Sequence, residues 1–380
     1  MAALELIIEL SGMILLFALV FGMSATVDIK ALVAQMKNKK AILTGCFLQF
    51  GVLPLCGFIV VKALDLKGTM GITLLVVTSS PGGSYSNWWC SMFNADLALS
   101  VTMTAVSTLL SIIMLPANLL LYSRYSYNDD IVDLLDWTSL IVSLVVVIGA
   151  ITLGLFCSAK IHSHRFNVLA NKMGNIAGIS LVLFSATMSN SGGGEAQIWE
   201  RDLQFYVGVA LPCVMGLVIS NIITTFMRLK KPERVTVSIE CCYQNVGIAT
   251  SVALTMFKDR DLAEAMGVPL YYGFVEAFIL GLYCIGAWKL GWTKAPPDAP
   301  FCHVLGMSYE VYRAEKLELE SVEVQLADDS TACDESISDL GDTIFAYFSL
   351  DDDEMDNRKE PSNLIEMERQ REESMRSIQA

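Results

Sequence analysis

The chain has 380 residues, of which 53% are hydrophobic, and its mean hydropathy is +0.50. This composition excludes an ordinary soluble protein and predicts a chain that crosses a membrane several times. The formal charge of −14 belongs to one end, because residues 1–294 hold 19 Lys/Arg and 18 Asp/Glu whereas residues 295–380 hold 7 and 22. We therefore expect a transmembrane domain over 1–294 and an acidic tail over 295–380.

Nine segments contain the roughly 20 mainly apolar residues that a membrane-spanning helix needs. We expect an all-α polytopic membrane protein with spans at 4–27, 41–61, 69–91, 97–122, 134–157, 168–190, 203–227, 235–257 and 265–288. Because the N-terminal stretch MAALELIIEL carries Glu5 and Glu9 and lacks a basic residue, we interpret it as the start of a retained span.

The basic residues of the connectors predict the orientation. With alternate connectors assigned to opposite sides of the membrane, one side holds thirteen Lys/Arg and the other six. The positive-inside rule places the richer side in the cytoplasm, so we expect the N-terminus outside and the C-terminal tail inside.

The third predicted span is interrupted by SSPGGSYSN at 79–87. Pro81 lacks a backbone N–H, and Gly82 and Gly83 tolerate unusual dihedral angles. Backbone groups left open at membrane depth must be covered by protein or face a cavity. We therefore expect an unwound helix with polar groups turned inward, with an ordinary proline kink as the alternative.

The fourth predicted span carries one polar stripe at helical spacing. Its members are Ser100, Thr104, Ser107, Thr108 and Ser111. Such a stripe can also serve helix packing alone.

The eighth predicted span has Glu240, Gln244 and Asn245 near its middle. A charged carboxylate there costs about 2.5–3.5 kcal/mol, so it usually marks a function. No Lys or Arg lies in the interior of a predicted span, so the countercharge is either a bound cation or a proton on the carboxylate. The hydroxyl, amide and carboxylate oxygens suit a hard ion such as Na⁺. A protonated Glu240 bonded to a neighbour is the structural alternative.

The two halves of the chain show a weak similarity. LQFGVLP at 48–54 resembles LQFYVGVALP at 203–212. The spans concerned run in opposite directions, as do the third and eighth, which is the relation between inverted repeats. Both the third and the eighth span are interrupted by polar residues, and in transporters this pairing indicates the binding site.

With these residues the chain resembles the bile acid:sodium symporter family, the sodium-coupled organic-anion transporters of solute carrier family ten. The resemblance covers most of residues 4–290 and rests on PGGSYSN at 81–87, DLALSVTMTAVSTLLS at 96–111 and ECCYQN at 240–245. It implies core and panel domains built from inverted repeats, two unwound helices that cross, and a plasma-membrane location.

The resemblance also implies ligands. One sodium site would use Ser86, Asn87, Ser100, Thr104 and Glu240. A second would use Gln49, Glu240, Gln244 and the backbone carbonyls of Cys241 and Tyr243, and the solute would face Ser84 and Asn245.

Glu276 in the ninth span departs from the family pattern, because relatives usually carry a neutral polar residue near this position. Beside the solute, a second acid would repel an anion unless it is protonated. Glu276 is thus compatible with a neutral, zwitterionic or cationic solute, with a proton-coupled step, or with a hydrogen bond across the panel domain. We include it among the candidate solute-binding residues.

We interpret the chain as a secondary active symporter of an organic anion, such as a bile acid or steroid conjugate, that works by alternating access. Two alternatives stay open: a carrier of a small carboxylate or non-anionic solute coupled to Na⁺ or H⁺, and a receptor or scaffold with the same fold. No Ser/His, His/Glu or paired-Asp arrangement occurs in the spans, so we expect no enzyme.

We expect Na⁺ as the coupling ion, no cofactor and no nucleic-acid partner. The acidic tail is predicted to be mostly disordered and available to cytoplasmic partners, since it combines low hydrophobicity with high net charge.

Overall fold

The computed structural model describes residues 2–26, 33–66, 68–83, 85–127, 137–161, 163–191, 198–257, 259–306 and 309. The chain divides into two compact units, Met1–Tyr312 and Arg313–Ala380. The second unit, and with it most of the predicted acidic tail, lies outside the described residues.

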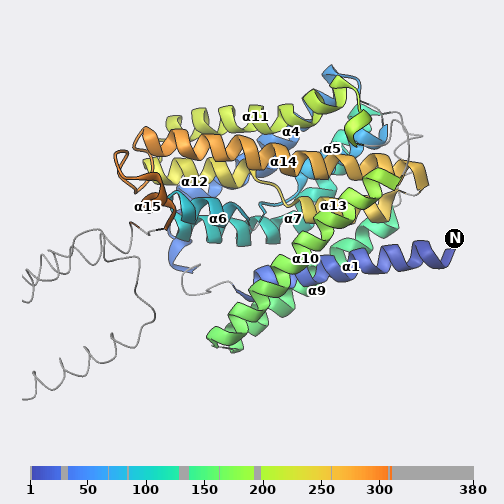
Figure 1. Ribbon diagram of the computed structural model, residues 1–380, viewed down its shortest axis with the longest axis horizontal. Helices are drawn as coiled ribbons and strands as arrows, with labels where there is room; N and C mark the ends of the chain where they lie inside the picture. Colours follow the sequence, from blue (N-terminus) through green and yellow to red (C-terminus); the bar gives the residue numbers. More distant parts are fainter. Residues whose placement is uncertain are drawn as a thin grey trace, which may run out of the picture. The chain divides into compact units, whose positions relative to one another are not determined.

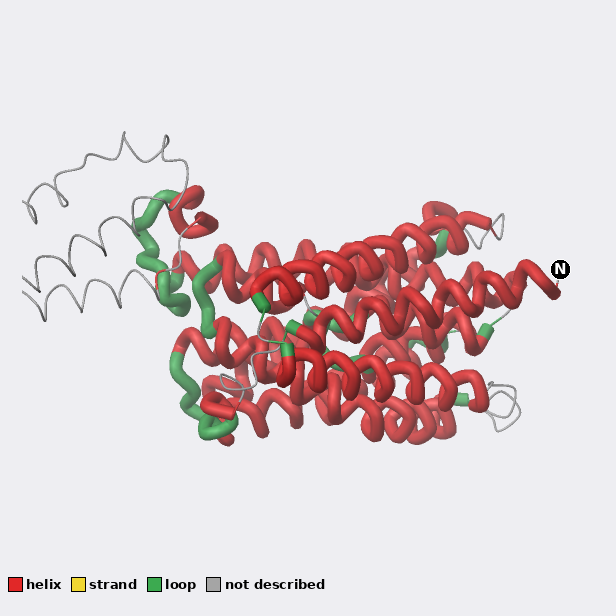
Figure 2. Tube along the Cα trace, turned by 90° about the horizontal axis from the view of Figure 1, so that it is seen from below, coloured by secondary structure: helices red, strands yellow, loops and turns green. Residues whose placement is uncertain are grey.

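In the described part of the chain all regular elements are helical, and one isolated β-bridge joins two loops (Figure 2). The elements are α1 (Ala2–Ala25), α3 (Lys39–Phe47), the π-helical turn η1 (Leu48–Val52), α4 (Leu53–Ala63), α5 (Gly68–Ser79), α6 (Tyr85–Met92), α7 (Leu97–Ser126), α9 (Trp137–Lys160), α10 (His164–Ser191), the 3₁₀ turn η3 (Ile198–Glu200), α11 (Leu203–Phe226), α12 (Lys231–Cys242), α13 (Val246–Met256), α14 (Asp259–Lys289) and α15 (Phe301–Gly306).

Several of these helices have the length and composition of membrane spans. Within the described ranges, five segments are long and apolar enough to cross a membrane: Lys39–Ala63, Leu97–Ser126, Arg165–Ser189, Leu203–Phe226 and Asp261–Lys289. Shorter apolar helices cover Leu10–Ala25, Gly68–Ser79, Val145–Lys160 and Val246–Met256. These are the features of a polytopic helical membrane protein, as the composition predicts, whereas the count of nine spans stays a prediction.

The helices pack as two groups (Figure 1). In the small group, α1 packs against both α9 and α10. The large group contains α3 to α7 and α11 to α14; in it α5 packs against α4, α7 and α14, and α11 packs against α12 and α14. The groups meet where α10 lies against α14 and where α13 lies against α1, α9 and α10. Between α10 and α14 the Ser185 hydroxyl donates to the Met266 carbonyl at 2.8 Å.

Glycine allows the backbones of α1 and α10 to come together. A Cβ on Gly22 of α1 would lie 2.6 Å from the Ala170 carbonyl oxygen and 2.7 Å from Cα of Gly174, both on α10. Because these are backbone atoms, they could not yield by a change of rotamer. The close contact between the two helices therefore requires glycine at position 22.

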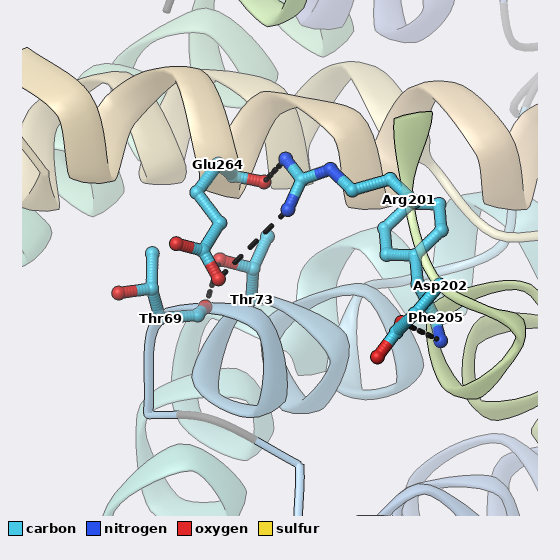
Figure 3. Close-up of polar contacts among 6 residues, drawn as sticks. All are labelled: Thr69, Thr73, Arg201, Asp202, Phe205 and Glu264. Atoms are coloured by element: carbon cyan, nitrogen blue, oxygen red, sulfur yellow. Dashed lines mark hydrogen bonds and ion pairs between the residues drawn. The ribbon is translucent and has the colours of Figure 1, made fainter. Parts of the chain in front are cut away.

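Arg201, just before α11, joins elements at one end of the large group (Figure 3). Its guanidinium lies 3.8 Å from the Glu264 carboxylate, donates to the Glu264 carbonyl at 3.2 Å and stacks over the Phe205 ring at 5.1 Å. Burial lowers the pKa of the Arg201 guanidinium, and the Glu264 carboxylate opposes that shift. Arg201 therefore joins the start of α11 to α14, and in Figure 3 the Glu264 carboxylate points toward Thr69 and Thr73 on α5.

Asn94, in the turn between α6 and α7, holds the segment that follows α14. Its side chain donates to the Val304 carbonyl at 3.0 Å and accepts from the Tyr309 N–H at 2.8 Å. Its backbone carbonyl accepts from the Lys294 N–H at 2.8 Å. Helix α15, in the region that the sequence assigns to the tail, is therefore attached to the transmembrane unit.

Gly22→Ala tests the contact between α1 and α10. Because the added methyl group meets backbone, we expect a loss of about 1–3 kcal/mol of folding free energy. The measurement is the midpoint of thermal unfolding of the detergent-purified protein. Gly286→Ala on α14 is the control, since a Cβ there meets nothing within 4 Å and alanine favours helix. An equal fall of the thermal midpoint in both variants would show that the contact with α10 is not the reason why position 22 requires glycine.

Candidate functional site

In two places of the large group, one helix ends and the next begins after a short non-helical segment. α5 ends at Ser79 and α6 begins at Tyr85, so Pro81, Gly82 and Gly83 lie between these helices. α12 ends at Cys242 and α13 begins at Val246. We call residues 80–83 the first break and residues 243–245 the second break.

The two breaks pair with each other. Gly83 donates its N–H to the Tyr243 carbonyl, and Asn245 donates its N–H to the Pro81 carbonyl, both at 2.9 Å. The residues between these partners, Gly82 and Gln244, face each other in an antiparallel bridge. A Cβ on Gly83 would lie 2.7 Å from the Gln244 carbonyl oxygen, so the approach requires glycine there.

The two residues that face each other across the breaks each donate an N–H to a side chain of a neighbouring helix. Gly82 donates to the Ser107 hydroxyl on α7 at 3.3 Å, and Gln244 donates to the Glu276 carboxylate on α14 at 2.8 Å. An unpaired N–H at membrane depth would cost several kcal/mol. The two breaks are thus completed in matching ways, which is the pattern that inverted repeats would produce.

Glu240 on α12 is the centre of a polar cluster beside the breaks. Its carboxylate accepts hydrogen bonds from Ser86 on α6 at 2.6 Å, from Thr104 on α7 at 2.9 Å, and from Ser100 on α7. Glu240 is 2% exposed, and no Lys or Arg among the described residues forms an ion pair with it. We call Glu240, Ser86, Asn87, Ser100 and Thr104 the Glu240 cluster.

The contact between Thr236 and Asp96 sets the register of this cluster. The Asp96 N–H donates to the Thr236 hydroxyl at 2.9 Å, and that hydroxyl lies 3.2 Å from the Asp96 carbonyl. Thr236 precedes Glu240 by four residues and Asp96 precedes Ser100 by four residues. One helical turn further on, α12 therefore brings its carboxylate to the polar face of α7.

The Glu240 cluster has more acceptor oxygens than protons. The Asn87 side-chain oxygen lies 2.7 Å from the Ser100 hydroxyl and 3.4 Å from the Thr104 hydroxyl. The Ser86 hydroxyl also lies 2.7 Å from the Gly83 carbonyl, and the Thr104 hydroxyl lies 3.1 Å from the Ser100 carbonyl. Each hydroxyl carries one proton but meets at least two acceptors. The unused lone pairs of hydroxyl, amide and carboxylate oxygens suit a hard cation such as Na⁺.

Gln49 lies in the π-helical turn η1, and Pro54 explains this turn. Pro54 has no N–H to donate to the Phe50 carbonyl four residues earlier, and Asn118 of α7 donates to that carbonyl instead, at 2.9 Å. The turn directs the Gln49 amide to the Ser80 carbonyl in the first break, at 2.8 Å. Such π-helical turns are frequent at functional sites.

Gln49 also reaches the second break. Its amide donates to the Gln244 side-chain oxygen at 2.9 Å, and the Gln244 amide donates to the Cys241 carbonyl at 2.6 Å. A cavity of about 10 Å³ lies against Gln49, Ser107 and Glu240. That volume is close to the minimum for one water-sized occupant. Of the side chains in the second predicted ligand set, Gln49 and Glu240 line the cavity and Gln244 does not.

A cavity of about 770 Å³ opens beside the Glu240 cluster, between the small group and helices α6 and α7. No Asp, Glu, Lys or Arg of the described residues lines it. Its polar lining includes Ser24, Asn87, Thr104, Thr108, Asn171 and Asn175. The remaining lining is largely apolar and aromatic, so the cavity is amphipathic and uncharged.

Two of the three predicted solute residues do not line this cavity, and the third, Ser84, is outside the described residues. Asn245 caps α13 by accepting from the Ile248 N–H at 3.1 Å, and Glu276 is 0% exposed. Neither Asn245 nor Glu276 lines the 770 Å³ cavity. Their assignment to the solute stays a prediction.

Sequence analysis missed the contribution of α1 and α10 to this cavity. Asn171 and Asn175 are four residues apart on α10, and this spacing was the one available signal. It also missed Tyr85 and Trp88, which follow the first break and line the cavity. The polar stripe of the fourth span includes Ser107, but nothing in the sequence indicates its hydrogen bond with Gly82.

Comparisons with known proteins find related membrane transporters. A family model described as Sodium Bile acid symporter family matches residues 13–194, which run from α1 through α10. The ileal sodium/bile acid cotransporter of Homo sapiens is 28% identical over 274 residues, 71% of this chain and 77% of that protein. The hepatic sodium/bile acid cotransporter of Homo sapiens is 25% identical over 258 residues, 68% and 73% of the two chains. Sodium/bile acid cotransporter 4 of Rattus norvegicus is 26% identical over 264 residues, 70% and 60%.

Ser107→Ala tests how the first break is completed. It leaves the Gly82 N–H unpaired, so we expect a loss of about 1–3 kcal/mol of stability, measured as a lower thermal midpoint in detergent. Ser111→Ala is the matched control, because the Ser111 hydroxyl makes the same kind of bond within α7, to the Thr108 carbonyl at 2.7 Å, without reaching a break. If both variants lose the same amount, the bond from Gly82 contributes nothing measurable.

Proposed function

Because the chain belongs to the sodium bile acid symporter family, we propose that it couples Na⁺ to the transport of a bulky organic solute, with an organic anion as the best-fitting class. Membership confirms the resemblance seen in the motifs of the third, fourth and eighth spans. The relatives are cotransporters rather than enzymes, and no catalytic role enters the proposal.

The observation that carries the proposal is that Asn87 and Thr104 belong both to the Glu240 cluster and to the lining of the 770 Å³ cavity. An ion held by the cluster would fix both side chains and so shape the wall that the solute meets. Coupling of this kind is reciprocal, so bound solute would raise the affinity for the ion by the same factor.

The size and lining of the cavity favour a bulky, amphipathic solute. Its volume of about 770 Å³ lies within the ~300–1,000 Å³ of pockets that enclose drug-sized ligands. A small carboxylate would leave most of this space to water. Hydroxyl and amide groups can bind the polar part of a solute, and Na⁺ nearby would offset a negative charge. Bile acids, the solutes in the relatives' names, have this amphipathic character.

We place the transport movement between the small group and the large group, which would be the panel and core domains of the family. Sodium at the Glu240 cluster would join α6, α7 and α12 while the small group moves past them, and the cavity would open to each side in turn. Each positive charge that moves inward gains about 2.3 kcal/mol per 100 mV, so two Na⁺ with a monoanion would be electrogenic. The plasma membrane, with the N-terminus outside, is the proposed location.

Uptake into cells that express the protein tests the function directly. We expect radiolabelled taurocholate or a sulfated steroid to accumulate in Na⁺ buffer and not in choline buffer, and pyruvate not to accumulate. Uptake of pyruvate alone would instead identify the solute as a small carboxylate rather than a bulky anion. No uptake of any of the three, with the protein verified at the cell surface, would contradict the proposal for organic anions.

Glu240→Gln should raise the Na⁺ concentration for half-maximal uptake at least about tenfold, because the variant keeps the shape of the ligand and removes its charge. Glu233→Gln on the same helix is the control. Glu233 bonds to the Lys230 N–H and to Asn38, both at 3.0 Å and away from the cluster, so uptake should keep its Na⁺ dependence. Unchanged Na⁺ dependence in the Glu240 variant would remove the carboxylate from the ion site.

Ala105→Phe should block uptake of the bulky solute while Na⁺ still stabilises the purified protein against heat. Ala105 lines the cavity, and a phenyl ring would fill part of it. Leu110→Phe on the same helix lies outside the cavity lining and should transport normally. Undiminished transport by the Ala105 variant would place the solute path elsewhere.

A further inference from the structure

Glu276 has one carboxylate oxygen more than its contact requires. One oxygen accepts the Gln244 N–H at 2.8 Å, and the other, Oε1, is buried without a hydrogen-bond partner in the described part of the chain. The side chain is 0% exposed, and no Lys or Arg among the described residues forms an ion pair with it. A buried carboxylate in this state is unfavourable unless it takes up a proton or a positive charge is bound next to it.

The matching contact at the first break shows what the carboxylate adds. Ser107 accepts the Gly82 N–H with a hydroxyl, as Glu276 accepts the Gln244 N–H. A neutral oxygen is therefore sufficient to complete a break. The negative charge and the second oxygen of Glu276 are therefore not needed to complete the break, and they can bind a ligand.

Tyr272 supplies a second unpartnered oxygen on the same helix face. It precedes Glu276 by four residues on α14, so the two side chains project from neighbouring positions. Its ring is 0% exposed, and its hydroxyl is buried without a hydrogen-bond partner among the described residues. Two buried oxygens with free lone pairs beside the second break offer ligands that a hard monovalent cation prefers.

We propose that Glu276 and Tyr272 bind a cation, Na⁺ under physiological conditions, on the α14 side of the second break. The inference rests on the proposed sodium coupling and adds to it a carboxylate separate from Glu240. With both carboxylates ionised, two bound Na⁺ are neutralised within the protein.

Sodium-dependent thermal stability of the full-length, detergent-purified protein tests this without a known solute. NaCl replaces choline chloride at constant ionic strength, and the thermal midpoint is followed. Glu276→Gln keeps an acceptor for the Gln244 N–H and removes the charge. We expect it to raise the Na⁺ concentration for half-maximal stabilisation about 10–100-fold. Tyr272→Phe should raise that concentration too, by a smaller factor.

Tyr283→Phe is the matched control for the tyrosine. Its hydroxyl also lies on α14 but bonds to the Asn221 side chain at 2.9 Å, so its loss should leave the Na⁺ response unchanged. A normal Na⁺ response in Glu276→Gln would overturn the inference and leave Glu276 a neutral acceptor for the break. Absence of any Na⁺ response in the unmodified protein would instead overturn the proposed sodium coupling, and this inference with it.

Discussion

A helix that opens inside a membrane needs another source of hydrogen bonds for its backbone, and here that source is a second opened helix. The Gly83 N–H bonds to the Tyr243 carbonyl, and the Asn245 N–H bonds to the Pro81 carbonyl. These bonds pair backbone groups that would otherwise need water as a partner. Such pairing is possible only if both helices open at the same depth and cross there. The crossing in turn places Ser86, in the first turn of the helix after one break, against Glu240, which precedes the other break.

The charge chemistry of the site follows from this arrangement. Backbone pairing leaves side-chain oxygens, rather than peptide groups, to surround the buried carboxylate. These oxygens come from α6, α7 and α12, so a bound ion would contact three helices at once. Since the same face of α7 also borders the large cavity, an ion can influence the solute without a long chain of intermediate contacts.

The sequence allowed part of this site to be predicted. Pro-Gly-Gly inside one apolar run and a carboxylate inside another both cost free energy in a membrane. Each therefore indicates a protein environment that offers hydrogen bonds or a countercharge. Their partners were harder to infer, because a hydrogen bond between Gly82 and Ser107 depends on how two helices pack and leaves no local pattern. The wall formed by α1 and α10 was missed for the same reason. Glycines such as Gly22 and small polar residues are common in membrane helices for many purposes.

The close contact between α1 and α10 has a consequence for the range of solutes. Ser24 and Asn175 line the cavity from these two helices, near the point where Gly22 and Gly174 bring the backbones together. The breadth of that wall is therefore set by the absence of a single methyl group at Gly22, which does not line the cavity itself. A relative with alanine there would hold the helices farther apart and admit broader molecules. Selection for solute width can thus act on a position that the solute never contacts.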